Sequence, residues 1–218
     1  MSTISFAQTN DSLVKIERTV NVDDDFYRED QIYFGVTHTI FGNKPEAFKQ
    51  NSISTGIMFG FLRDIPLNKQ RNISIAPGAG LVFFNLRNNL TALPSDNDYL
   101  MDSSYDKNLQ NLTYLEVPLE LRWRTSNKYS HKFWRIYTGV KFSYLIKDVA
   151  KYVGDEGDFS YKSNPHLNKM NLGAYISAGF NTWNVYAYYG FKKKKKKDVL
   201  PNNKNLNFFN VGLMFYIL

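Results

Sequence analysis

The chain has 218 residues, of which 43% are apolar and 16% aromatic, and it carries a formal net charge of +7. No run approaches the roughly 18 consecutive apolar residues that a membrane helix needs, and the mean hydropathy is -0.40, so a helical membrane protein is excluded. The absence of cysteine rules out disulfide bonds and thiolate chemistry, and scattered basic residues without a readable recognition helix argue against nucleic acid as a partner.

The N-terminus divides into two segments that precede the patterned part of the chain. Residues 1–7 resemble the end of a secretory signal peptide, with small residues at Ser5 and Ala7 where cleavage would occur. Since the basic region and most of the apolar core are missing, we hypothesise that the true leader starts upstream and that the mature chain begins near Gln8. An ordinary short N-terminus is the alternative. Residues 8–29 are acidic and without period, which predicts a flexible tail.

Residues 30–218 contain eight segments in which apolar and polar residues alternate, and we interpret them as one barrel domain. Their lengths of roughly ten to fourteen residues suit tilted membrane-spanning strands. The predicted strands are residues 31–41, 52–64, 72–85, 112–124, 133–146, 170–180, 183–191 and 207–218.

The connections between these segments alternate in length. Long polar loops are expected at residues 42–51, 86–111, 147–169 and 192–204, and short links at residues 65–69, 126–131 and 181–182. This asymmetry is typical of outer-membrane barrels, whose long loops are extracellular and whose short turns are periplasmic. We therefore predict an all-β fold, an eight-stranded antiparallel transmembrane β-barrel in the outer membrane with both termini periplasmic. A soluble lipocalin-like barrel is the structural alternative.

Two features of the strand ends support this prediction. Trp123, Trp134 and Trp183 all fall at the short-link ends of their strands, where an aromatic interface girdle belongs. The last strand carries the pattern of the C-terminal signal that is read by the outer-membrane insertion machinery, from Asn210 to Ile217. We expect this strand to close the barrel against the strand that begins near Gln31.

Four short stretches resemble the PorT-like outer-membrane β-barrel family: residues 64–69 (DIPLNK), 116–125 (EVPLELRWRT), 132–137 (KFWRIY) and 215–218 (FYIL). The resemblance covers about residues 30–218. It implies an eight-stranded barrel of a kind often labelled a porin. Some members of that family are accessory parts of the type IX protein secretion machinery.

Charged residues on the inner faces of neighbouring strands are the main candidate site. The interior of an eight-stranded barrel is just wide enough for its own side chains, so we expect these residues to form a salt-bridge network that plugs the lumen. A narrow ion channel is the alternative, and a general acid and base pair is less favoured because each glutamate has an arginine close by. The predicted network comprises Glu116, Glu120, Arg122, Arg124, Arg135 and Lys141.

No catalytic, cofactor or metal site is predicted, because His38, His131 and His166 lie on separate segments. A lipid-processing enzyme that uses His38 or His166 with a loop serine stays open as an alternative. The strongest charge run is a candidate contact for lipopolysaccharide phosphates or an acidic partner, although a solvated loop whose lysines repel one another is the preferred interpretation. This run comprises Lys192, Lys193, Lys194, Lys195, Lys196 and Lys197.

Taken as one prediction, the sequence indicates a non-enzymatic, plugged barrel surrounded by outer-membrane lipid and lipopolysaccharide. A plugged barrel offers only its outer wall, its loops and its tail for binding. We therefore expect an accessory or structural subunit of a larger envelope complex for secretion, import or barrel assembly.

Overall fold

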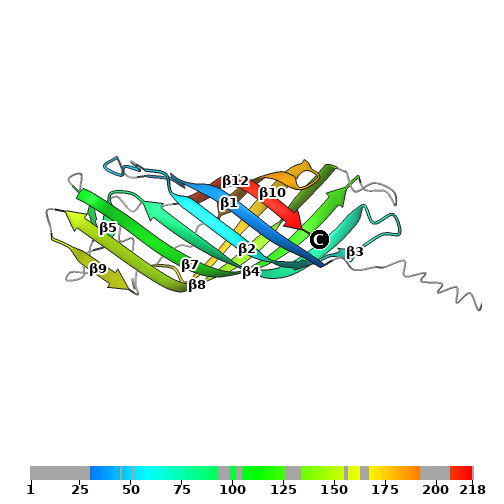
Figure 1. Cartoon of the computed structure of the whole chain (residues 1–218), viewed down its shortest axis with the longest axis horizontal. Helices are drawn as coiled ribbons and strands as arrows, with labels where there is room; N and C mark the ends of the chain where they lie inside the picture. The colour runs from blue at the N-terminus through cyan, green and yellow to red at the C-terminus, as the bar shows by residue number, and fades with distance from the viewer. Residues whose placement is uncertain are drawn as a thin grey trace, which may run out of the picture.

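A computed structural model describes residues 30–44, 46–50, 52–92, 99–101, 105–125, 134–154, 157–162, 167–191 and 207–217. These residues form an elongated antiparallel β structure (Figure 1). None of them belongs to a helix that is long and apolar enough to cross a membrane. The predictions for residues 1–29, His131, His166 and the lysines at 192–197 fall outside the described residues.

The eight predicted strands close into an antiparallel barrel, as expected. Each strand pairs with the next along the chain, and the last pairs with the first from Ile32 opposite Ile217 to Gly42 opposite Asn207. The strands are β1 (Asp30–Gly42), β2 (Thr55–Arg63), β4 (Ile73–Arg87), β7 (Tyr105–Arg124), β8 (Trp134–Gly154), β10 (Met170–Phe180), β11 (Trp183–Gly190) and β12 (Asn207–Ile217).

Four shorter strands complete the described sheet structure. β3 (Ile65–Pro66) pairs with β4, β9 (Phe159–Lys162) pairs with β8, and β5 (Leu90–Ala92) pairs with β6 (Tyr99–Met101). The connections between β2 and β4, β7 and β8, and β10 and β11 lie at one end of the barrel, which we call the short-link end. The opposite end, where β5 and β9 lie, is the long-loop end (Figure 1).

The strands follow from alternation, and β7 shows this most clearly. From Tyr114 to Arg124 every second residue is buried, and the residues between them are exposed. The side chains of Leu115 and Val117 point outward, whereas those of Glu116 and Glu120 point into the lumen. Because strand side chains alternate between faces, one face of β7 lines the lumen and the other forms the outer wall.

The predicted bounds of two long loops are wrong in part. β4 continues to Arg87, β7 begins at Tyr105 and β8 continues to Gly154, so the paired strands β7 and β8 extend beyond most of the barrel at the long-loop end (Figure 1). For β8 the cause is a β-bulge: Thr113 lies opposite Lys147, but Tyr114 lies opposite Leu145, which leaves Ile146 as an extra residue. A bulge interrupts the period of two, and an interrupted period in a sequence looks like the end of a strand.

Candidate functional site

The centre of the lumen at the short-link end is a cluster of buried ion pairs. Arg122 donates from Nε to Glu120 Oε2 at 2.7 Å and from Nη1 to Asp64 Oδ1 at 2.9 Å. Arg124 Nη2 donates to Asp64 Oδ2 at 2.9 Å. These four side chains are almost completely buried, and Asp64 bridges the two arginines.

Side chains from other strands tie this cluster to the whole circumference. The hydroxyls of Tyr175 and Tyr216 donate to Glu120 Oε1 at 2.9 and 3.2 Å, and Ser74 Oγ donates to Asp64 Oδ1 at 2.7 Å. Arg122 Nη1 also donates to the side-chain oxygen of Gln31, at 3.0 Å. These partners lie on β10, β12, β4 and β1, so the cluster spans the lumen from wall to wall.

Arg122 and Arg135 pack against the same two aromatic rings. The Arg122 guanidinium lies 4.7 Å from the centre of the Tyr137 ring and 5.6 Å from that of Tyr216. Arg135 is also buried, at 5.8 Å from Tyr137 and 5.9 Å from Tyr216. Cation–π contacts of this kind are favourable where water is excluded. They place both guanidinium groups in one layer of the lumen.

A second ion pair lies nearer the middle of the barrel. Lys141 Nζ lies 2.8 Å from Glu116 Oε2 and donates to the Tyr186 hydroxyl at 3.0 Å. The ammonium group is also 5.1 Å from the Tyr175 ring and 5.8 Å from the Tyr188 ring. Each lumenal glutamate is therefore held by its own cation. This arrangement differs from a pair of free carboxylates.

All six residues of the predicted network are buried in the lumen. The structure joins Glu120, Arg122 and Arg124 through Asp64, which sequence reasoning missed, and it joins Lys141 to Glu116 in a separate pair. The available signal was the period of two itself: Asp64 directly follows β2 and has the same parity as the buried residues Met58 and Leu62 of that strand. The lumenal tyrosine hydroxyls that complete the cluster were not predicted as part of it.

The long-loop end of the lumen is filled by apolar side chains. Phe48, from the link between β1 and β2, packs on Phe41, which packs in turn on Phe208, with ring centres 5.3 Å apart in both pairs. Asn89 fixes this link through its backbone N–H to the Lys49 carbonyl at 3.1 Å and its side-chain amide to the Ala47 carbonyl at 2.8 Å. Its side-chain oxygen also accepts from the Lys49 N–H at 2.7 Å. The link between β1 and β2 is thus anchored beside the end of β4, with Phe48 buried.

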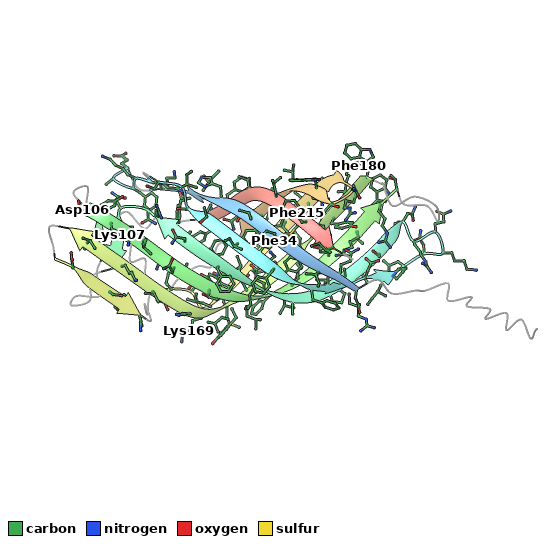
Figure 2. All side chains as sticks on the ribbon, in the orientation of Figure 1. Phe34, Asp106, Lys107, Lys169, Phe180 and Phe215 are labelled. Atoms are coloured by element: carbon green, nitrogen blue, oxygen red, sulfur yellow. The ribbon has the colours of Figure 1, made fainter. Side chains whose placement is uncertain are left out.

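The outer wall has the opposite character. Phe34 and Phe215 lie side by side on β1 and β12 with ring centres 6.3 Å apart (Figure 2), and all strands carry exposed apolar residues on this face. Trp123, Trp134 and Trp183 point outward near the short-link end, where Trp134 contacts Phe180 at 5.4 Å and Trp183 contacts Phe215 at 4.9 Å. The outer faces of soluble barrels must be polar over much of their area, so this wall does not suit the lipocalin-like alternative.

A closed antiparallel barrel with an apolar outer wall, aromatic residues near its rim and ion pairs inside has the architecture of an integral outer-membrane protein. The chain belongs to the family described as "Outer membrane protein beta-barrel domain", whose model matches residues 6–194.

Solved structures of two bacterial barrels are similar to this chain. Ail, the attachment invasion locus protein of Yersinia pestis, in complex with the heparin analogue sucrose octasulfate, is 13% identical over 87% of this chain and 99% of that chain, with a TM-score of 0.40. The N-terminal β-barrel domain of Pseudomonas aeruginosa OprF is 8% identical over 88% of this chain and 100% of that chain, with a TM-score of 0.28. No curated protein matches the sequence significantly.

Proposed function

We propose that this protein is a non-enzymatic outer-membrane barrel with a plugged lumen, which acts as an accessory or structural subunit of a larger envelope complex. The observation that carries the proposal is the buried cluster of Asp64, Glu120, Arg122 and Arg124, whose ion pairs connect several strands across the lumen. An eight-stranded barrel has little interior space beyond that of its side chains. A water-filled path would have to separate these pairs.

The energetics of buried charge argue against a channel. Breaking a buried ion pair by removing one partner typically costs about 3–5 kcal/mol, because an uncompensated charge stays in a medium of low polarity. Asp64 has two such partners, and Glu120 adds two tyrosine hydroxyls to its arginine. A conducting state would therefore require several costly separations at once.

The same pairing weighs against an enzyme that uses the lumenal glutamates. A general acid or base must reach the proton that it transfers, but Glu116 and Glu120 are enclosed with their cations. His38 lies on the outer face of β1, where its Nδ1 is 3.0 Å from the Ser54 carbonyl oxygen. His166, the alternative histidine, falls outside the described residues.

Binding is therefore assigned to the outer wall, the loops and the N-terminal tail. In this proposal the termini and the short-link end face the periplasm, and the strand pair β7–β8 extends outward at the long-loop end through lipid and lipopolysaccharide. The resemblance of residues 64–69 and 116–125 to the PorT-like family favours a secretion complex among the candidate partners. Import and barrel-assembly complexes are the other candidates.

Site-specific photo-crosslinking from native membranes tests the proposal. A photoreactive residue is placed in turn at outward positions around the barrel: Phe59 on β2, Leu119 on β7, Ile176 on β10 and Leu213 on β12. A partner complex is expected to crosslink at neighbouring positions on one side, and the opposite positions serve as internal controls. Recovery of an uncrosslinked monomer from all four variants, together with its purification in mild detergent without a stoichiometric partner, would contradict the subunit role.

Single-channel recording tests the plugged lumen separately. The purified protein in a planar bilayer is expected to show no steady conductance, because its ion pairs occupy the lumen. A steady, reproducible current would overturn this part of the proposal.

A further inference from the structure

Four exposed lysines gather where the apolar outer wall ends at the long-loop end. On β8 the outward residues run from Trp134 through Phe142 and Tyr144 to Ile146, and apart from Thr138 they are apolar or aromatic. The next residues on this face are Lys147, the half-buried Val149 and Lys151, and two more lysines lie on the neighbouring segments. We call this group the lysine patch; it comprises Lys147, Lys151, Lys162 and Lys169.

The strand register brings three of these lysines together. Lys162 on β9 is directly opposite Val149, which lies between Lys147 and Lys151 on the same face of β8. Diagonal neighbours of this kind have side chains about 7–8 Å apart, within reach of a long side chain. Their ammonium groups can therefore converge on one small anion.

Lys169 joins the patch from the barrel side. Its carbonyl accepts a hydrogen bond from the Leu145 N–H at 2.7 Å, and it immediately precedes Met170, which pairs with Tyr144. Lys169, which is exposed and labelled in Figure 2, therefore lies at the height where the apolar wall ends.

No carboxylate among the described residues forms an ion pair with any lysine of the patch. Asp148 has the inward parity of the buried Tyr152, and Asp158, at the start of β9, lies beyond the patch toward the tip. Like charges at this spacing repel each other. A bound anion would remove that repulsion and accept several charge-assisted hydrogen bonds.

We propose that the lysine patch binds the phosphorylated headgroup of an outer-leaflet lipid whose acyl chains lie along the apolar wall beneath it. This site rests on the orientation proposed above, with the long-loop end outside. The combination of four cations with an adjoining lipid-facing strip at Phe142, Tyr144 and Leu172 matches a molecule with an anionic head and a long apolar tail. A free phosphate ion would use only the lysines, and an acidic protein would leave the apolar strip unused.

Native mass spectrometry of the full-length protein in detergent, titrated with monophosphorylated lipid A, measures this binding directly. Replacing three lysines of the patch (Lys147→Gln, Lys151→Gln and Lys162→Gln together) is expected to weaken lipid binding by at least about tenfold, since each surface lysine contributes on the order of fivefold. Lipid A without its phosphate is expected to bind the natural protein as weakly as the phosphorylated lipid binds this variant.

A matched control removes the same charge elsewhere: Lys44→Gln, Lys49→Gln and Lys69→Gln together are expected to leave the affinity unchanged. Equal affinity of the patch variant and the natural protein would overturn the site, as would an equal loss in the control. Competition by millimolar inorganic phosphate alone would overturn the assignment to a lipid. The assay uses purified protein, so a lack of lipid binding would contradict the lysine patch and would say nothing about the partner complex.

Discussion

Asp64 is the residue on which the lumenal cluster depends most. Its side chain is fully buried, its Oδ1 accepts from Ser74 and Arg122, and its Oδ2 accepts from Arg124. Asp64→Asn keeps the size of the side chain but removes its charge. The asparagine side chain has one acceptor oxygen in place of two. Its NH2 group would face a guanidinium donor, with which it cannot form a hydrogen bond.

The expected cost follows from the number of partners. Arg122 keeps Glu120, but Arg124 loses the buried carboxylate to which its Nη2 donates. Breaking a buried pair costs about 3–5 kcal/mol, so Asp64→Asn is expected to lower the free energy of unfolding by that amount. The matched control is Asp30→Asn. Its pair with Arg63 is 3.8 Å long and half exposed, and such surface pairs contribute about 0–1 kcal/mol.

Urea titration in lipid vesicles, followed by tryptophan fluorescence, measures both variants. The three tryptophans lie on the outer wall and move from lipid to water on unfolding, so they report on the whole barrel. If Asp64→Asn does not fold, Ser74→Ala removes one hydrogen bond and keeps the ion pairs, with an expected loss of about 1 kcal/mol. A cost for Asp64→Asn no larger than that for Asp30→Asn would refute the role of the cluster in stability.

Two further predictions concern packing at the long-loop end. A Cβ at Gly173 would overlap the Tyr188 ring, whereas at its ladder partner Gly190 nothing lies nearer than 3.6 Å. Gly173→Ala is thus expected to lower the free energy of unfolding by about 1–3 kcal/mol in the same titration, and Gly190→Ala by much less. Adding Tyr188→Leu to Gly173→Ala should recover most of the lost stability. Equal costs for the two glycine substitutions would contradict the overlap. Asn89→Ala removes the two side-chain hydrogen bonds to the link around Phe48 and keeps the backbone one, so amide hydrogen exchange should accelerate in the link and stay unchanged in the strands. Unchanged exchange in the link would show that Asn89 does not hold it.

The sequence was sufficient for the barrel because one physical rule governs most of the chain. Each strand separates lipid from lumen, so its side chains must alternate, and the alternation can be read without knowing any contact. The same rule predicts the burial of Glu116, Glu120 and Arg122, since the side chains on the inner face of a strand point into the lumen and away from lipid.

Which inward side chains contact one another could not be predicted from this alternation. Alternation says that Asp64 and Arg124 face inward, but their contact depends on the relative shift of β2, β4 and β7, which sequence periodicity does not encode. The bulge at Ile146 is a second example. It reverses the phase of the pattern within β8 and concealed eight further strand residues, up to Gly154.

The two ends of the lumen are closed by different forces, and this has a consequence for function. At the short-link end charged groups are held by one another, whereas near Phe41 and Phe48 the lumen is held by apolar packing and a backbone link. Salt screens buried ion pairs much less than exposed ones, so it would hardly loosen the first region, and kosmotropic salts strengthen apolar packing in the second. Because no one trigger weakens both, opening of the lumen is a poor route to regulation. Selection for binding should therefore act on the outward residues, where the lysine patch and the apolar wall meet.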